Sequence, residues 1–421
     1  MNQVRVWLKK GNRSPPGNFV QDLVQNPGPS LNYPFRVKRD IGTEECNVKK
    51  PIVIFTANRG YALTSSRTLL IQRFLSFGWE VVLATADDAE SRSLVHMGVH
   101  LEPVVFHRGG FSPLTDMKTY RRLAAIYKKL QPVLVQHFHA KPVILGSLAA
   151  RATAGDEVLV VNAITGLGHA FITNGMTARL AGVGYKLVRT RTDAIIFQNR
   201  DDYTLFGQRS WVEAEKARLI PGSGVDVERF AVADRDKRDG ASPVIVMLGR
   251  LLRQKGISEF VEVAKRIQVK WPGAQFLLAG EEDPVHPDAV TAKWVQEQES
   301  VRYLGRLTEV RPLLGQADIL LFPSYREGLP RVILEAAASG LPTVAYDVPG
   351  VRDAVRDGKT GYLAGCPDIE ALTQKVQELI ENPEKRLRMG RAARKMVEME
   401  FDIRVVQERY LDVYRELGVD I

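Results

Sequence analysis

The stretch 319–345, ILLFPSYREGLPRVILEAAASGLPTVA, carries the signals that decide the fold class. It opens with four apolar residues, which is typical of a strand buried on both faces. A polar loop with Gly328 follows, and Pro330 suits the first turn of a helix that Gly340 ends. A second apolar run begins at Thr343. Strand, helix and strand in this order predict a parallel sheet covered by helices, an α/β fold.

The same alternation runs through most of the chain. Further strands are predicted at 52–55, 80–84, 133–135, 158–161, 194–197, 243–248 and 275–279, with helices between them such as 143–151 and 257–270. A Pro/Gly turn and a highly charged stretch at 221–240 interrupt the pattern. We therefore expect two doubly wound domains, 51–225 and 226–395, which face each other across a cleft and bind ligands at the carboxyl ends of their strands.

The charge composition bears on which classes of ligand the protein can bind. Of 421 residues, 58 are Lys or Arg and 49 are Asp or Glu, a net charge of +9. Residues 1–50 hold nine of these cations and four of the acids, so the remaining residues carry only +4, being 49 minus 45. A body so close to neutral does not favour a nucleic-acid binder. The five prolines of residues 1–50 predict a flexible extension, with a small packed appendage as the alternative.

Features that would place the protein outside the cytoplasm are missing from the sequence. The two cysteines stand far apart, which predicts a reduced compartment without a disulfide framework or zinc cluster. The N-terminus has charges where a signal peptide needs its apolar run, and no apolar run of about 18 residues predicts a membrane span. We expect a cytoplasmic protein, and contact with the inner face of the cell membrane stays open.

Two carboxylates frame the loop and helix of the opening stretch. Glu327 precedes the helix and Glu335 lies inside it, about 7–8 Å further along. That spacing is too wide for a carboxylate dyad but suits two groups that hold different parts of one extended ligand. The loop amides and the helix N-terminus would attract an anion. Alternatively, Glu335 is an ordinary salt-bridged helix residue and Glu327 a partner of the helix dipole.

A second loop, GRLLRQKG at 249–256, leaves a predicted strand and enters a helix. Arg250 and Lys255 could together neutralise a diphosphate, the first as a planar fork and the second as a point charge. The alternative is a solvated basic loop. The spacing of a Walker A loop is absent.

Three weaker signals remain. His137 and His139 follow the predicted strand 133–135, where alternation would turn only one of them towards the cleft. No third metal ligand lies near them, and Asp234–Asp236 falls in the charged linker, so we expect no metal site. Gly166 and Gly168 would allow a backbone to approach a ligand closely.

Taken together, these segments resemble the retaining family 4 glycosyltransferases of the GT-B architecture, over most of residues 51–415. They are similar in particular to a subgroup that builds bacterial surface polysaccharides and exopolysaccharides on polyprenyl-diphosphate carriers. The resemblance rests on the segments 249–256, 323–342, 347–350 (DVPG), 357–363 (DGKTGYL), 136–151 (QHFHAKPVILGSLAAR), 162–171 (NAITGLGHAF) and 197–202 (FQNRDD).

The resemblance implies a role for each residue of the donor side. Arg250 and Lys255 would bind the diphosphate of a nucleotide sugar, for which we expect UDP. Glu335 would bind the ribose hydroxyls, and Glu327 the transferred sugar near its C3 and C4 hydroxyls. The loop of Gly328, Leu329 and Pro330 would hold the sugar and phosphates.

On the other side of the cleft, the resemblance places His137 at the transferred sugar. His137 is preferred to His139 because the family has a histidine four residues before the lysine, here Lys141. Arg59, Gly60, Lys141 and Gly166 are expected on the acceptor side. The Arg59–Gly60 turn lacks the paired glycines of the family's first loop.

The implied reaction is transfer of a hexose or N-acetylhexosamine to a saccharide hydroxyl with retention and without a metal or other cofactor. Two cations and a helix N-terminus can offset the charge that develops on the departing diphosphate. A sugar-nucleotide epimerase or hydrolase of the same fold is the alternative enzyme. An inactive scaffold in polysaccharide assembly is the alternative outside enzymes.

A lipid-linked acceptor would favour a basic, apolar surface on the first domain. The helical segments 118–130 and 176–191 are candidates for contact with an anionic membrane, and core-packed helices with a charged outer side are the alternative for each. In this architecture a final helix, here 396–421, commonly crosses back to the first domain.

Overall fold

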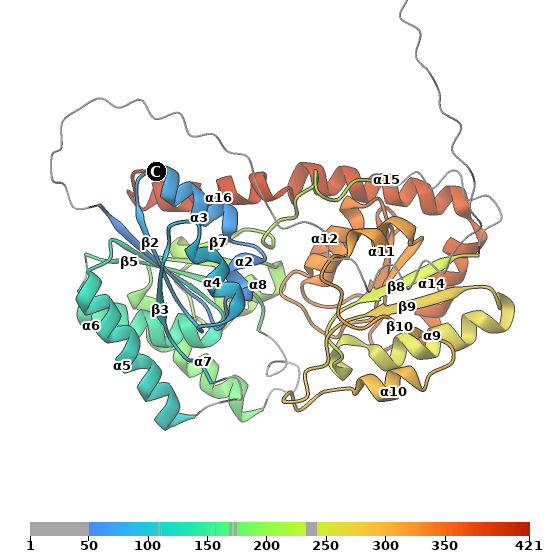
Figure 1. Ribbon diagram of the computed structural model, residues 1–421, viewed down its shortest axis with the longest axis horizontal. Coiled ribbons are helices and arrows are strands. Elements are labelled where there is room, and N and C mark those ends of the chain that lie inside the picture. The colour runs from blue at the N-terminus through green and yellow to red at the C-terminus, as the bar shows by residue number, and fades with distance from the viewer. Residues whose placement is uncertain are drawn as a thin grey trace, which may run out of the picture.

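Two parallel β-sheets form the centres of two domains, as the computed structural model shows (Figure 1). It describes residues 50–107, 110, 112–155, 157–167, 171, 175–232 and 242–421. The predicted extension up to residue 49, Gly168 and Asp234–Asp236 lie outside these residues. Strand order is β3-β2-β1-β4-β5-β6-β7 in the first sheet and β10-β9-β8-β11-β12-β13 in the second. The predicted α/β fold with two doubly wound domains is confirmed.

The strands of the first sheet are β1 (Ile52–Thr56), β2 (Glu80–Thr85), β3 (His100–Pro103), β4 (Leu134–Phe138), β5 (Leu159–Ile164), β6 (Ala194–Phe197) and β7 (Ala217–Leu219). Those of the second are β8 (Val244–Leu248), β9 (Gln275–Ala279), β10 (Arg302–Tyr303), β11 (Ile319–Phe322), β12 (Thr343–Tyr346) and β13 (Gly361–Ala364). The short edge strands β3, β7, β10 and β13 were not predicted, because apolar runs mark the buried central strands of a sheet.

Helices cover both faces of the first sheet. One face packs against α5 (Pro113–Leu130), α6 (Ser147–Thr153) and α7 (Met176–Val188), and the other against α3 (Thr68–Ser76) and α16 (Ile403–Glu416). Alternation along β1 shows this division, since Ile54 lies in the cluster with α5 while Val53 lies in the cluster with α16.

The remaining helices are α2 (Tyr61–Thr64), α4 (Ala89–Val95), α8 (Arg200–Gln208), α9 (Ile257–Lys270), α10 (Ala292–Gln296), α11 (Arg311–Gln316), α12 (Arg331–Ala338), α13 (Val351–Ala354), α14 (Ile369–Glu381) and α15 (Pro383–Glu400). Short 3-10 segments cover 189–191, 214–216 and 253–255. The segment predicted as a helix at 143–151 begins as a π-helical turn, Pro142–Gly146, before α6. Of the helices described, none is long and apolar enough to cross a bilayer.

The chain returns to the first domain between α15 and α16 (Figure 1). Helix α15 belongs to the second domain, because Met396 and Val397 lie in its core. Helix α16 instead contributes Tyr410 and Tyr414 to the core of the first domain. The change of domain therefore falls after Phe401, whereas we expected it at residue 396; a continuous helical pattern does not reveal which core each turn joins.

The two crossings between the domains run side by side. Val225 N donates to Phe401 O at 2.9 Å, and Ile403 N donates to Val225 O at 3.0 Å. The outgoing linker and the returning chain are thus joined by backbone hydrogen bonds. Any change in the angle between the domains must pass through this pair of segments.

Leu411 offers a test of how strongly α16 holds the first domain. Its side chain is fully buried in that core. We expect Leu411→Ala to lower the free energy of unfolding by about 2–5 kcal/mol, because the substitution removes buried apolar contacts and leaves a cavity. Urea denaturation measures the loss, with Met399→Ala as the control because Met399 is exposed on α15. Equal effects of the two substitutions would contradict the packing described here.

Candidate active site

Three loops of the second domain meet at the carboxyl edge of its sheet. They follow β8, β11 and β12, which are neighbouring strands. Backbone hydrogen bonds join them, from Tyr325 N to Gln254 O at 3.0 Å and from Glu327 N to Pro349 O at 3.1 Å. The two loops that the sequence singled out, 249–256 and 323–330, are therefore parts of one surface.

Lys255 and Glu327 form the centre of this surface. Lys255 Nζ donates to Glu327 Oε1 at 2.5 Å, and Ser324 Oγ donates to the same oxygen at 2.7 Å. Both charged side chains are largely shielded from solvent. A cation and a carboxylate are thus held together where the strands end, and each can exchange its partner for a ligand group of opposite charge or for a sugar hydroxyl.

Arg250 lies on the same loop as Lys255 but has a different partner. Its Nη1 donates to Asp283 Oδ2 at 2.9 Å, and about half of its side chain is exposed. The sequence predicted that Arg250 and Lys255 act on one anion. In the structure the two cations share a loop, and each is paired with a separate carboxylate.

The helix after loop 323–330, which we call the donor loop for the role that the resemblance implies, begins where the sequence predicted it. Pro330 is the N-cap and α12 starts at Arg331, while Leu329 is buried beneath it. Glu335 Oε1 accepts from Arg331 Nη2 at 3.1 Å, and burial raises the pKa of this carboxyl. Arg331 also donates to the carbonyl of Ser65 in the first domain. Glu335 therefore lies where the two domains touch.

Gly166 brings the first domain against the donor loop. Its φ of +117° is in the region that favours glycine, and a Cβ built there would lie 2.7 Å from the Cα of Gly328. A Cβ on Gly328 would in turn lie 1.9 Å from Thr165 O. The sequence predicted a close approach to a ligand at Gly166, whereas the structure shows one to the backbone of the donor loop. A side chain on either glycine would separate the two loops.

Asn199 and Asp202 also hold the donor loop, and sequence reasoning missed their role. Asn199 caps α8 by accepting from Asp202 N at 2.7 Å, and its Nδ2 donates to Gly328 O at 2.7 Å. Asp202 is fully buried and is paired with Arg326, the residue before Glu327. An Asn three residues before an Asp signals a helix start, but it does not reveal a partner 124 positions away.

More exposed ion pairs surround this contact. Arg352 donates to Asp201 at 2.9 Å, and Arg200 lies 3.7 Å from Asp353. Each pair joins the first domain to the second. The start of α8 is therefore an electrostatic contact with the loops after β11 and β12.

His137 is not where the sequence placed it. The strand β4 continues through His137 and Phe138, so the imidazole lies under α5 and α6 and is fully buried. Its Nδ1 lies 2.8 Å from Asn162 Oδ1 and its Nε2 lies 3.1 Å from the hydroxyl of Tyr127. The expectation that His137 faces the cleft is wrong. The predicted strand ended at residue 135, whereas β4 includes the polar residues Gln136 and His137 and buries both.

His139 occupies the position beyond the strand end. Its φ is +73°, and its Nδ1 is buried without a hydrogen-bond partner among the described residues. Burial and the nearby Arg67 lower the pKa of His139 to about 4. The ring is therefore neutral at physiological pH, at the same sheet edge as Gly166.

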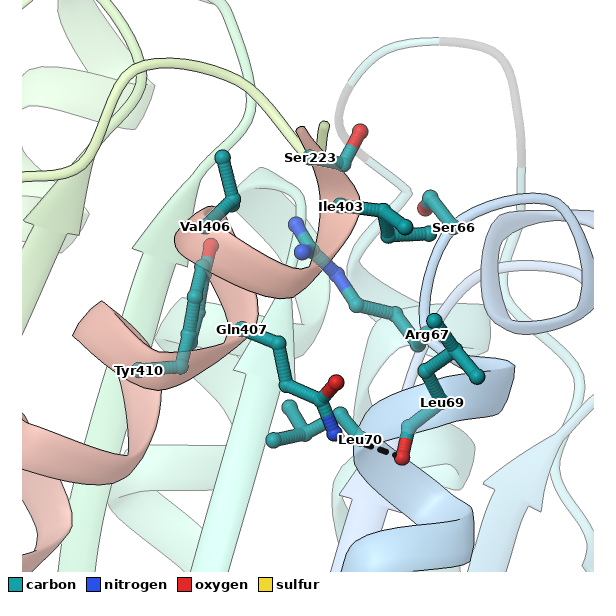
Figure 2. A pocket seen from close by; sticks show the side chains of 9 residues that line it. All are labelled: Ser66, Arg67, Leu69, Leu70, Ser223, Ile403, Val406, Gln407 and Tyr410. Atoms are coloured by element: carbon teal, nitrogen blue, oxygen red, sulfur yellow. Dashed lines mark hydrogen bonds between the residues drawn. The ribbon is translucent and has the colours of Figure 1, made fainter. Parts of the chain in front are cut away.

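Arg67 is buried and lines a small cavity together with Tyr410 (Figure 2). Its guanidinium carbon lies 4.7 Å from the ring centres of Phe138 and Tyr410, and none of the described acidic side chains pairs with it. The adjoining cavity of about 10 Å³ between α3 and α16 has room for about one water molecule. Arg67 thus joins the returning helix to the strand that carries His137 and places a cation beside His139.

The remaining predicted acceptor residues make contacts within the first domain. Gly60 N donates to Asp88 Oδ2 at 3.0 Å, and a Cβ on Gly60 would collide with Asp88. Lys141 pairs with Asp116 at 2.7 Å. Arg59 is exposed. Within the part of the chain that the structure describes, no three His, Cys, Asp or Glu side chains are grouped to hold a metal ion.

The environment of His137 predicts an acid-sensitive fold. Burial lowers its pKa from 6.5 to about 4, so below pH 6.5 the unfolded chain binds a proton that the folded chain excludes. We expect the free energy of unfolding to fall by about 1.4 kcal/mol per pH unit between these values from this group. His137→Gln should reduce that slope in urea titrations, while the exposed His96→Gln should leave it unchanged. An unaltered slope in His137→Gln would refute the assignment.

Comparison with known proteins agrees with this architecture. Residues 53–199 match the family model of glycosyl transferase 4-like proteins, and residues 231–396 match that of glycosyl transferases group 1. Both matches fall on the domains described above.

Two bacterial relatives match over most of their length. The N,N'-diacetylbacillosaminyl-diphospho-undecaprenol alpha-1,3-N-acetylgalactosaminyltransferase of Campylobacter jejuni is 26% identical over 374 residues, covering 86% of this chain and 97% of the relative. The putative glycosyltransferase EpsD of Bacillus subtilis is 26% identical over 379 residues, covering 86% and 96%.

Among solved structures, HepE of Anabaena in complex with UDP superposes with a TM-score of 0.72 at 16% identity. The match covers 87% of this chain and 100% of that one. Sucrose-phosphate synthase of Thermosynechococcus elongatus superposes with a TM-score of 0.69 at 19% identity, covering 88% and 99%. With both domains matched in sequence and in fold, this chain belongs to the GT-B glycosyltransferases that join a glycosyl transferase 4-like domain to a glycosyl transferases group 1 domain.

Proposed function

We propose that this glycosyltransferase moves a hexose or N-acetylhexosamine from a UDP-sugar to a hydroxyl of a growing saccharide on a polyprenyl-diphosphate carrier. The observation that carries the proposal is the Lys255–Glu327 pair, held beside the N-terminus of α12 and closed over by Gly166 of the first domain. This arrangement provides positive charge for a diphosphate and a carboxylate for sugar hydroxyls within one cleft.

The donor diphosphate would exchange partners with the ion pairs of the site. Lys255 leaves Glu327 and Arg250 leaves Asp283, so that both cations reach the phosphates and Glu327 is released to the sugar hydroxyls. Glu335, next to Arg331, would receive the ribose hydroxyls. Charge developing on the departing diphosphate is then offset by two cations and the amides of α12, with no metal ion required.

Retention of the anomeric configuration is part of the proposal. The leaving phosphate would accept the proton of the attacking hydroxyl on the same face of the sugar, while the oxocarbenium-like centre forms between them. The bond from the anomeric carbon to the phosphate oxygen breaks and the bond to the acceptor oxygen forms. Determining the anomeric configuration of the product by NMR tests this step, since an inverted linkage would exclude it.

At the other side of the sugar we assign His139 in place of His137. His139 lies beyond the strand end, is only partly buried and carries a neutral ring, whereas His137 is fully buried with both nitrogens engaged in the core. Since the named relative from Campylobacter jejuni acts on a diphospho-undecaprenol saccharide, we place this protein in the cytoplasm, at the inner face of the cell membrane.

A panel of UDP-, GDP- and ADP-sugars tests the function. Release of nucleoside diphosphate is measured with and without a polyprenyl-diphosphate saccharide extract, for the wild type, Glu327→Ala and the control Glu384→Ala, an exposed residue of α15. Release that needs one donor and the acceptor, and is lost only in Glu327→Ala, supports the transferase. Release without acceptor favours the hydrolase or epimerase, and UDP binding without release favours the scaffold.

A further inference from the structure

Helix α7 carries an apolar stripe that the described parts of the protein leave uncovered. The exposed fractions are 70% for Met176, 39% for Leu180, 67% for Val183 and 52% for Leu187. Steps of four, three and four residues place these side chains along one side of the helix. Among the helices described, no other carries more than two exposed large apolar residues.

The opposite side of α7 fixes its orientation. Tyr185 and Val188 are buried in the first domain, and the Tyr185 ring lies 4.7 Å from that of Phe206 and 5.9 Å from that of Trp211. The stripe is therefore held outward by the core. Helix α5 differs, because the apolar side that the sequence offered to a membrane, with Leu123 and Ile126, is packed in the core.

Cations flank the stripe without acidic neighbours on the same segment. Residues 175–191 contain no Asp or Glu, and their four cations are Arg179, Lys186, Arg189 and Arg191. The last two donate to the backbone carbonyls of Ser210 and Leu187, so their charge is not cancelled by these bonds. The segment thus presents a net charge of +4 beside exposed apolar side chains.

The surface continues onto the start of α5. Gly110 lies against Thr177 of α7, and just beyond it Leu114 is 83% and Met117 49% exposed. Both helices cover the same face of the sheet, away from α16 (Figure 1). The apolar stripe and the start of α5 therefore belong to one side of the first domain.

We propose that this side docks the first domain onto an anionic bilayer, with α7 lying in the interface plane and its stripe in the acyl boundary. Exposed apolar residues flanked by Lys and Arg, with no acidic residue on the same segment, are the pattern of interfacial helices on anionic membranes. The inference rests on the proposed lipid-linked acceptor, which this docking would bring to the cleft.

Vesicle flotation of the full chain tests it without donor or acceptor, so the result is independent of whether the transferase assignment holds. We expect binding to vesicles of phosphatidylcholine with phosphatidylglycerol that weakens with salt, and little binding to phosphatidylcholine alone. Replacing Arg179, Lys186 and Arg191 by Gln should weaken binding about 100-fold, at about fivefold for each cation.

The apolar contribution is tested separately. The triple variant Leu180→Ser, Val183→Ser and Leu187→Ser should bind at least about tenfold more weakly, because less apolar surface enters the interface. Val269→Ser, at an 85% exposed valine of α9, is the matched control and should bind as the wild type does. An unchanged melting temperature and an unchanged circular dichroism spectrum confirm that each variant is folded.

Three results would overturn the proposal. The stripe variant and the wild type would bind vesicles equally, or neutral vesicles would bind as well as anionic ones. Alternatively, light scattering would find a wild-type oligomer that the stripe variant dissociates, which would make this side a protein interface.

Discussion

Lys255→Ala is expected to lower kcat for sugar transfer about 100- to 1,000-fold. Lys255 is the one cation of the site in direct contact with Glu327 among the described residues, and it is largely shielded from solvent. In the proposed reaction it moves to the diphosphate, where a positive charge acts on the oxygen that becomes negative in the transition state. Removing one such preorganised donor costs about 2.7–4 kcal/mol in enzymes that stabilise a developing oxyanion. Initial rates of acceptor-dependent UDP release measure the loss.

Two further variants separate this effect from a general loss of charge. Lys265→Ala removes an exposed lysine of the helix that follows the same loop and should keep the wild-type rate. Lys255→Arg keeps the positive charge and should therefore recover part of the activity. Recovery should be incomplete, because the planar fork of arginine does not match the geometry of a single amine. A Lys255→Ala enzyme with wild-type kcat would remove Lys255 from the mechanism.

Arg326→Ala is expected to lower the free energy of unfolding by about 3–5 kcal/mol, since it leaves the fully buried Asp202 without its cation. Burial already raises the pKa of Asp202, with Arg326 acting in the opposite direction, so the lone carboxylate would be strongly disfavoured. The same change frees the donor loop beside Glu327, and we expect kcat to fall while UDP still binds to the second domain. Urea denaturation and UDP titration measure the two effects.

The double variant Asp202→Ala/Arg326→Ala provides the decisive comparison. Removing both partners leaves no buried charge, so much of the stability should return while transfer stays slow. Arg200→Ala is the matched control, because Arg200 also faces the second domain but is 83% exposed and lies 3.7 Å from Asp353. Its free energy of unfolding should change by about 0–1 kcal/mol. Additive effects of Asp202→Ala and Arg326→Ala would mean that the two residues do not act as a pair.

Much of the fold could be read from local pattern. The strand 319–322 and the helix 257–270 have the predicted bounds, because continuous apolar runs and amphipathic spacing follow directly from burial on a parallel sheet. The same logic failed at β4. There Gln136 and His137 are buried polar residues, satisfied by Tyr414 and Asn162 from distant elements, and no local signal marks such partners.

In the candidate site too, some features could be predicted from local sequence and others could not. Lys255, Glu327 and Glu335 could be chosen from the sequence because loops after buried strands and the start of a helix create an anion site by themselves. Their pairing could not, since Lys255 and Glu327 are 72 positions apart and meet only because β8 and β11 are neighbours in the sheet. The hydrogen bond from Asn199 and the ion pair of Asp202 with the donor loop likewise form only when the two domains are in contact.

Helices α5 and α7 show what the sequence determines and what the tertiary structure determines. The sequence alone determined that the segments at 118–130 and 176–191 are basic and amphipathic, because helical spacing is a local property of the chain. Only the tertiary structure decided between them, by turning the apolar side of α5 into the core and that of α7 outward. The physical reason is that burial depends on the neighbours that the rest of the chain supplies, and those neighbours are set by the packing of the whole domain.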